Sequence, residues 1–224
     1  EADRDITANV NLGNVDTYTV STGQTLTALA SQVTGLTVDG AGSLIVEALA
    51  ADSDLTNVNP GGGVTALVEA DRDITANVNL GNVDTYTVST GQTLTALADQ
   101  VDGVVVDGEG GLTVSGVASD ATDLSSLSAD IVDITGANLT AGVVTWMTVA
   151  AGDELRLTSG QATGQTIGAA TDATAVIVVS GLAADANLSN VGNMTATVAA
   201  TVTGSIDITA NVNLGNVDTY TVST

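Results

Sequence analysis

Hydrophobic residues recur at every second position over several short stretches of this chain. The pattern is clear in residues 6–12, 44–48, 64–68 and 143–149, where small or aliphatic side chains alternate with mostly polar ones. A period of two places one face of an extended strand in a core and the other in solvent. Short runs such as GLTVDG and GVVVDG end at glycine, as strands that close into turns do. The pattern therefore predicts a series of short strands.

One segment has a helical period instead. In TLTALASQV, Leu26, Leu29 and Val33 lie three or four positions apart, which is the spacing of one face of a helix. The segment is short, so we expect only a turn or two of helix at a corner of the fold. The local pattern thus predicts an all-β protein with short helical turns at some corners.

The chain also repeats its own sequence. Residues 1–30, EADRDITANVNLGNVDTYTVSTGQTLTALA, recur letter for letter at 69–98, and DITANVNLGNVDTYTVST returns at 207–224. Repetition of this kind is the sequence signature of a repeat architecture. We therefore interpret residues 1–224 as one continuous repeat array. The tripeptide DIT divides it into three units and a partial fourth: 5–72, 73–132, 133–206 and 207–224.

Each unit divides further into pieces that are close to one solenoid coil in length. In the first unit these pieces are 5–25, 26–49 and 50–72. Stacked coils bury their apolar faces against each other, and coils of identical sequence present identical surfaces in register. We therefore predict a parallel β-solenoid (β-helix) of about 20–24-residue coils.

Two other architectures fit parts of the pattern. The first is a chain of small β domains, but units as short as 73–132 with few aromatic side chains would bury little surface alone. An immunoglobulin-like sandwich also needs about 100 residues and a core tryptophan. The second alternative is a solenoid of the leucine-rich-repeat kind, with alternating strands and helices.

The charge of the chain excludes several kinds of partner. There are 26 acidic residues against three arginines, with no lysine or histidine, and the formal net charge is −23. Such a polyanion repels nucleic-acid phosphates and anionic membrane surfaces. No stretch reaches the ~20 apolar residues of a membrane-spanning helix. We expect no nucleic-acid binding and no membrane insertion.

The same composition disfavours an enzyme. Without histidine or cysteine, the usual general base and the thiol nucleophile are missing. Paired carboxylates can cleave glycosides, but here the carboxylates lie mostly in repeated turns, whereas an active site is normally a single constellation. We therefore predict a non-enzymatic protein.

The acidic turns suggest a cation instead. In a solenoid, carboxylates of successive turns would approach within about 5–10 Å and repel unless bridged. Calcium, which takes about 6–8 oxygen ligands, is the cofactor that fits best. Our candidate ligands lie in the AD-x-[DN]-L turns and in one further group: Asp52, Asp54, Asp120, Asp123, Asp185 and Asn187, then Asp102, Asp107 and Glu109. The alternative interpretation is that these side chains form Asx turns and caps.

One long stretch resembles a known kind of repeat. Residues 17–58, TYTVSTGQTLTALASQVTGLTVDGAGSLIVEALAADSDLTNV, are similar to repeats of very large bacterial surface and secreted proteins, of the S-layer-like, biofilm-adhesin and RTX-associated kinds. The resemblance implies an extracellular or cell-surface location, a calcium-rich setting and a mechanical or adhesive role. The RTX nonapeptide G-G-x-G-x-D-x-U-x is absent, since DGEGGLTV at 107–114 lacks the aspartate in the required place.

These observations lead to two functional hypotheses. The first is a structural protein that forms an extracellular fibre, sheath or surface layer, by stacking of repeats and by self-association into a homopolymer or lateral assembly. The same coil type begins and ends the chain, so an end could accept a coil of the next molecule. The second is a passive stalk of a large bacterial adhesin whose binding tip lies outside these residues. Three N-x-S/T sequences, at Asn138, Asn187 and Asn193, fit glycan attachment, although so short a motif often arises by chance.

Overall fold

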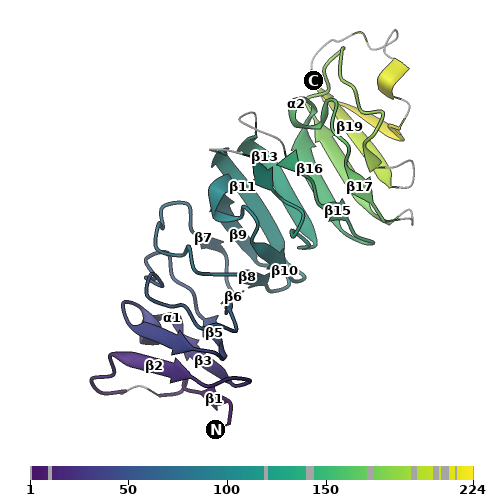
Figure 1. Cartoon of the computed structure of the whole chain (residues 1–224). Coiled ribbons are helices and arrows are strands. Elements are labelled where there is room, and N and C mark those ends of the chain that lie inside the picture. The colour runs from purple at the N-terminus through teal and green to yellow at the C-terminus, as the bar shows by residue number, and fades with distance from the viewer. Residues whose placement is uncertain are drawn as a thin grey trace.

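The chain folds into an elongated parallel β-solenoid (Figure 1). The computed structural model describes residues 2–9, 12–118, 121–139, 144–170, 174–192, 196–203, 207, 212–214 and 216–223. Every strand pairing among these residues is parallel. The predicted fold class, an all-β parallel solenoid with short helical turns at some corners, is confirmed.

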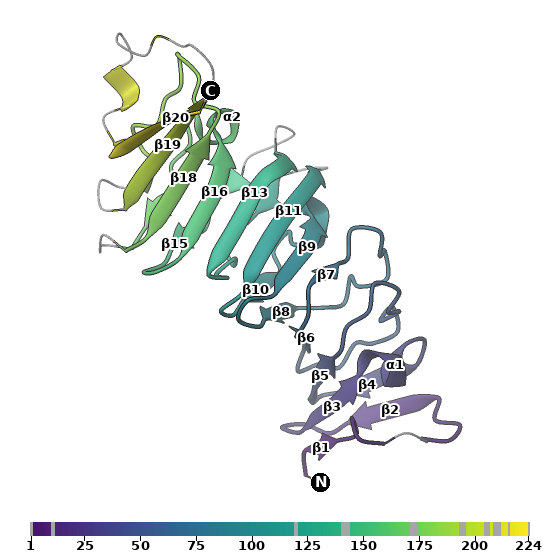
Figure 2. The ribbon, with the colours of Figure 1, turned by 180° about the vertical axis from the view of Figure 1, so that it is seen from behind.

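Two long sheets run along the stack (Figure 2). In the first, the strand order is β1 (Arg4–Asp5), β3 (Thr25–Leu29), β5 (Ser43–Glu47), β6 (Val64–Val68), β8 (Thr85–Val88) and β10 (Val105–Asp107). In the second, the order is β7 (Arg72–Asp73), β9 (Thr93–Leu97), β11 (Gly111–Val117), β13 (Ile131–Asn138), β16 (Glu154–Thr158), β18 (Val176–Ser180), β19 (Thr197–Thr203) and β20 (Thr219–Ser223). Strands from distant parts of the sequence therefore form continuous ladders along the stack.

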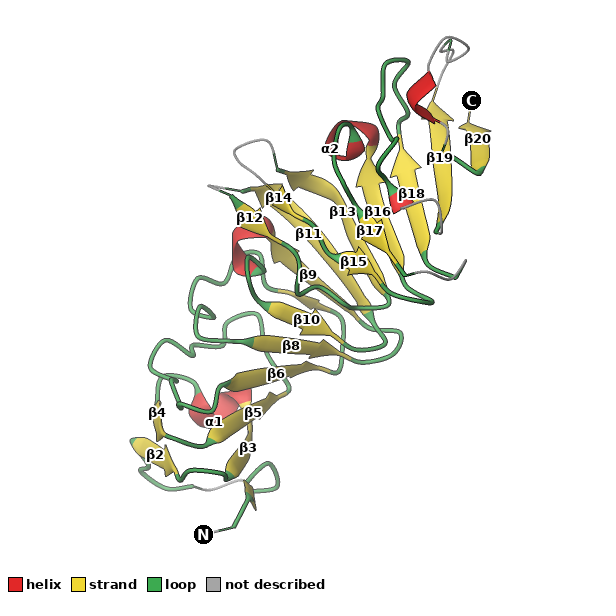
Figure 3. Cartoon of the chain, turned by 45° about the vertical axis from the view of Figure 1, so that its right-hand side comes forward, coloured by secondary structure: helices red, strands yellow, loops and turns green. Residues whose placement is uncertain are grey.

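Shorter elements close the coils. Three strand pairs lie outside the long sheets: β2 (Thr17–Val20) with β4 (Thr37–Gly40), β12 (Thr122–Asp123) with β14 (Val144–Thr145), and β15 (Thr148–Val149) with β17 (Gly168–Ala169). The helical turns are α1 (Ala30–Val33), η1 (Ala98–Gln100), α2 (Ser159–Ala162) and η3 (Val212–Leu214) (Figure 3). None of the helices in the described residues is long and apolar enough to cross a membrane. The predicted helical segment begins as strand β3, and the helix itself starts only after Leu29.

The register between strands gives the length of each coil. The coil length is the number of residues between two paired positions in adjacent strands. The shortest such steps run from Thr25 to Ser43 and from Thr93 to Gly111, and the longest step runs from Ile131 to Glu154. The other steps lie between these limits. Each step advances the stack by one strand spacing of about 4.8 Å.

The alternating sequence places aliphatic side chains inside every coil. In β6, Val64, Ala66 and Val68 are buried while the threonine and leucine between them are half-exposed. The buried side chains form one cluster that extends from Val20 to Leu214. Burial of one such leucine or valine contributes about 1.5–3 kcal/mol. The core is therefore narrow, and the coils share it.

The turns that follow the strands depend on glycine. Gly108, directly after β10, has a φ of +100°, and a Cβ placed there would lie 2.3 Å from the Val88 carbonyl oxygen of the coil before it. Gly40, the last residue of β4, occupies the equivalent place and also has a φ of +100°. Only glycine fits such a close approach in this conformation, so the run V-D-G ends its strand for a steric reason.

The first and second units join through β6. This strand continues the stack of β3 and β5, and β8 then pairs with β6, so that Thr65 lies opposite Thr85 and Val68 opposite Val88. The strand β2 has the same TYTV sequence as β8 and pairs with β4 in the register in which β8 pairs with β10. Among the described residues, β8 differs from β2 by its additional pairing with β6.

The second and third units join differently. The second unit, 73–132, is shorter than the first, 5–72. The DIT tripeptide that follows the second unit lies inside β13. The strand β13 pairs directly with β16 of the third unit. The third unit ends as the first does, because β20 lies on β19 as β8 lies on β6. The longer units therefore end in an additional strand that receives the TYTV strand of the next unit.

Candidate functional site

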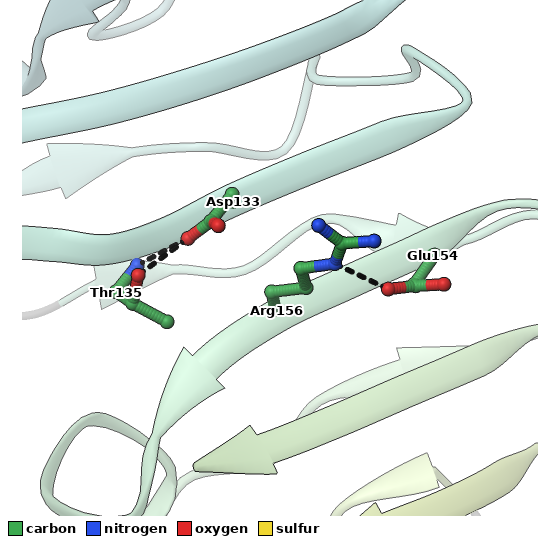
Figure 4. A network of polar contacts seen from close by, with 4 residues as sticks. All are labelled: Asp133, Thr135, Glu154 and Arg156. Atoms are coloured by element: carbon green, nitrogen blue, oxygen red, sulfur yellow. Dashed lines mark hydrogen bonds and ion pairs between the residues drawn. The ribbon is translucent and has the colours of Figure 1, made fainter.

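The aspartate of the DIT tripeptide forms a turn with the threonine two residues later. The Thr7 backbone N–H (2.9 Å) and hydroxyl (2.7 Å) both donate to Asp5 Oδ1. The Thr135 groups donate in the same way to Asp133 Oδ1, at 2.9 and 2.6 Å (Figure 4). These contacts are Asx turns.

The predicted calcium ligands of the AD-x-[DN]-L turns form the same kind of turn. Asp54 Oδ1 accepts from the Thr56 N–H (3.0 Å) and hydroxyl (2.6 Å), and Asp123 Oδ1 accepts from the Ser125 N–H at 2.9 Å. Asn187 Oδ1 likewise accepts from Ser189. Asp52 and Asp185 are exposed, and Asp120 lies outside the described residues.

The second predicted group does not assemble around one point. Asp102 Oδ1 accepts from the Asp123 N–H of the next coil at 2.6 Å, and Glu109 Oε2 accepts from the Thr90 hydroxyl at 2.6 Å. The Oδ1 atom of Asp107 is buried without a hydrogen-bond partner among the described residues. Within the described part of the chain, no three acidic side chains gather as metal ligands would. Calcium binding by these residues stays a prediction.

One arginine pairs with an acidic side chain on the face of the second sheet. Arg156 Nε donates to Glu154 Oε1 on the same strand, β16 (Figure 4). Asp133 lies on the neighbouring strand, opposite Arg156 in register. The side chains of Arg156 and Glu154 are 42% and 28% exposed, so the pair contributes little to stability.

A glutamine in each complete unit has a structural role that sequence reasoning missed. Gln100 Nε2 donates to the carbonyl oxygens of Ile74 (2.8 Å) and Asn77 (2.7 Å) in the coil below, while its Oε1 accepts from the Leu97 N–H (2.8 Å). Gln32 and Gln161 make the equivalent three contacts in the other units. Each of these glutamines follows the DIT aspartate of its unit at nearly the same interval, and that interval is the signal that could have identified them.

The aspartate that directly precedes the TYTV sequence forms hydrogen bonds across the junction between two units. Asp84, which precedes β8, accepts from the Val64 N–H through Oδ2 at 2.8 Å, and its own N–H donates to the Val64 carbonyl at 3.0 Å. Asp218 makes the same pair of contacts with Val198, at 2.8 and 2.9 Å. The aspartate carboxylate thus caps a backbone N–H near the start of β6 or β19, the strand that pairs with the TYTV strand.

Apolar side chains that are buried at the internal junction are exposed at the two ends of the described stack. Tyr86 and Val88 of β8 are 1% and 0% exposed, whereas Tyr220 and Val222 of β20 are 41% and 68% exposed. At the other end, a mostly apolar pocket of about 230 Å³ is lined by residues including Ile6, Tyr18, Val20 and Leu26. Apolar surface of this kind at a solenoid end is where a further coil would pack.

The chain is therefore a repeat-built β-solenoid. Comparison with protein families, with curated proteins and with solved structures gave no match.

The Asx turns make the stability of the solenoid depend on pH. Hydrogen bonds from threonine or serine lower the pKa of Asp5, Asp54, Asp73 and Asp123 below its usual value. A lowered pKa gives stability that is present above about pH 4 and lost as the pH falls through the folded-state values. The melting temperature, followed by circular dichroism, is expected to stay level from pH 7 to about 5 and to fall below about 4. A fall of the same size after Asp5, Asp54, Asp73 and Asp123 are replaced by asparagine, which forms the same turn without titrating, would contradict this role of the turns.

Proposed function

We propose that this chain is a non-enzymatic structural protein whose stacked repeats build an extracellular fibre, sheath or surface layer through association with further copies of itself. The observation that carries the proposal is the way in which one repeat unit lies on the next: β8 of the second unit pairs with β6 of the first, and both strands face one core that extends along the described stack. At this junction Tyr86 and Val88 are 1% and 0% exposed. Units that join through strand pairing and shared burial build a rod, which is the element from which a fibre, sheath or surface layer is made.

The shape and charge of the molecule support a structural role. The coils share one continuous core along the described stack, so the molecule is a stiff body whose length grows with the number of coils. The formal charge of −23 keeps such rods apart laterally in low salt. In this proposal calcium acts as a bridging cation between acidic turns, in keeping with the oxygen ligands that it prefers.

Electron microscopy and sedimentation of the purified chain test the proposal. Filaments or ordered layers that grow with protein concentration are expected, with wider lateral association when calcium is added. Dispersed single rods at every concentration, with and without calcium, would contradict self-assembly and favour the passive stalk of an adhesin. Magnesium at the same ionic strength is the matched control, because it screens charge equally and binds carboxylate cages less readily.

A further inference from the structure

A hollow lies between two successive coils in the interior of the array. The loop from β7 to β8 forms one side of it, and η1 with the residues that follow forms the other. Its volume is about 350 Å³, within the range of small-molecule pockets, about 300–1,000 Å³. Val78, at its edge, is 91% exposed. The apolar walls are Val78, Leu80, Val83, Leu97 and Val104.

Most polar side chains that line this hollow are already bonded within the protein. The Thr75 hydroxyl donates to Asp73. The Asn77 amide donates to the Ser53 carbonyl, and the Gln100 amide donates to two carbonyl oxygens of the coil below. These groups therefore fix the shape of the hollow.

The tyrosine of the hollow differs from them. Tyr86 is 1% exposed and lines the hollow, yet its hydroxyl has no hydrogen-bond partner within the part of the chain that the structure describes. Burial raises the pKa of Tyr86 above its usual value, so the phenol is neutral at pH 7 and can both donate and accept. A buried hydroxyl without a partner is costly, and an oxygen of a ligand in the hollow would satisfy it.

The first unit contains the same hollow. Its lining includes Leu12, Val15, Tyr18 and Leu29, which occupy the positions of Leu80, Val83, Tyr86 and Leu97 in the repeat. The Tyr18 hydroxyl is also buried without a partner among the described residues. The unpartnered hydroxyl is thus a feature of the repeat.

The two hollows differ at the rim. In the second unit the rim carries Asp99 and Asp102, both exposed. The first unit has Ser31 and Thr34 at these positions. The second hollow therefore has a buried hydroxyl at its inner end, apolar walls, and carboxylates at its outer end.

We propose that the hollow of the second unit binds a small amphiphilic amine. The apolar body of the ligand lies between the aliphatic walls, its ammonium group faces Asp99 and Asp102, and an oxygen at its other end forms a hydrogen bond with the Tyr86 hydroxyl. The chain has no lysine, so the amine comes from outside the chain. This inference goes beyond the proposed function and does not require self-association.

Three related compounds test the three features of the ligand. Tyramine has an amine, an apolar ring and an oxygen, whereas 2-phenylethylamine lacks the oxygen and 4-ethylphenol lacks the amine. Binding to the unassembled chain is followed in the proton–nitrogen spectrum by the amides of residues 99–104, whose sequence differs from the equivalent 31–36. Tyramine is expected to bind about tenfold more tightly than either of the other two.

Tyr86→Phe removes the hydroxyl and keeps the ring. Tyramine is then expected to bind about tenfold more weakly, no better than 2-phenylethylamine, whose affinity is unchanged. The melting temperature should stay the same or rise, because the hydroxyl has no protein partner to lose. Tyr220→Phe, outside the hollow, is the control and is expected to leave tyramine binding unchanged. A variant Tyr86→Phe that binds tyramine as tightly as the unmodified chain would overturn the role of the hydroxyl.

Asp99→Ser with Asp102→Thr gives the second hollow the rim of the first. Thr34 Oγ1 accepts from the Asp54 N–H at 3.4 Å in the first unit. Asp102 Oδ1 accepts from the Asp123 N–H at 2.6 Å in the second, so the exchange keeps this contact between coils. Tyramine is expected to bind about tenfold more weakly to this variant, while the affinity for 4-ethylphenol is unchanged.

The control for the rim is Asp39→Ser with Asp185→Ser. It changes the net charge by the same amount at two exposed positions outside the hollow and is expected to leave tyramine binding unchanged. Equal losses with the two pairs would overturn the assignment of the rim carboxylates. If tyramine up to about 10 mM shifts none of the amides of residues 99–104, the site is wrong, and the proposed function stands or falls separately on the assembly experiments.

Discussion

Replacing Tyr86 by alanine is expected to destabilise the solenoid by about 3–5 kcal/mol, as truncation of a large buried side chain does. Tyr86 is 1% exposed and lies on β8, between the coils of β6 and β10. Removing its ring would leave a cavity in a narrow core that has few other large side chains to fill it. Urea unfolding followed by circular dichroism measures the change.

The matched control for this substitution is Tyr220→Ala. The preceding sequence is identical, but Tyr220 is 41% exposed, so the expected loss in the unassembled chain is below about 1 kcal/mol. A similar loss at both positions would contradict the claim that coils on both sides bury the internal tyrosine.

Changing Gln100 to glutamate is expected to cost about 2–4 kcal/mol of the free energy of unfolding. The substitution keeps the size of the side chain and the acceptor for the Leu97 N–H, but it removes the donor to the carbonyls of Ile74 and Asn77. A carboxylate would then face two partly buried carbonyl oxygens. Thermal and urea unfolding at pH 7 measure the loss.

Gln24→Glu is the control for this substitution. Gln24 Nε2 donates to the neighbouring Gly23 carbonyl on an exposed turn, so the expected change is within about 0.5 kcal/mol. The deficit of Gln100→Glu relative to the unmodified chain should shrink below about pH 4, because a protonated glutamate can donate one hydrogen bond again. A deficit that is the same at pH 7 and at acidic pH would show that the lost donor is not the cause.

The sequence predicted the architecture because two independent signals agree. The alternation in 64–68 indicates a strand with one buried face, and the repetition of whole segments indicates coils that cover each other. The helical spacing of Leu26, Leu29 and Val33 was partly misleading. Leu26 and Leu29 lie in β3, where Leu26 packs inward because the strand ladder decides the local conformation over a coincidental helical spacing.

The junctions could not be predicted from the repeats alone. The sequence TYTV is the same in β2 and β8, so nothing local distinguishes them. Both strands pair with the strand that follows in the next coil, and β8 pairs in addition with β6, which lies in the part of the first unit that makes it longer than the second. This difference in length decides which strands pair with each other. Its effect on the pairing appears only when the coils are stacked.

The acidic turns show a different limit of prediction from sequence. Aspartate suits both calcium coordination and Asx turns, and the sequence alone left both interpretations open. In the structure, Asp54 and Asp123 each accept hydrogen bonds within their own turn. The role of the glutamines was missed because a glutamine at an exposed-looking corner gives no hydrophobic signal, although its regular spacing from DIT was present in the sequence.

The amide spectrum of the isolated second unit, residues 73–132, tests most directly whether the coils depend on their neighbours. In this fragment β8 loses β6, and β11 loses most of β13, so the narrow core is open at both ends. The stacked structure predicts a poorly dispersed proton–nitrogen spectrum and no cooperative melting, whereas the full chain gives both a dispersed spectrum and a cooperative transition. A fragment that is well dispersed and melts cooperatively on its own would be a self-sufficient domain and would contradict the shared core.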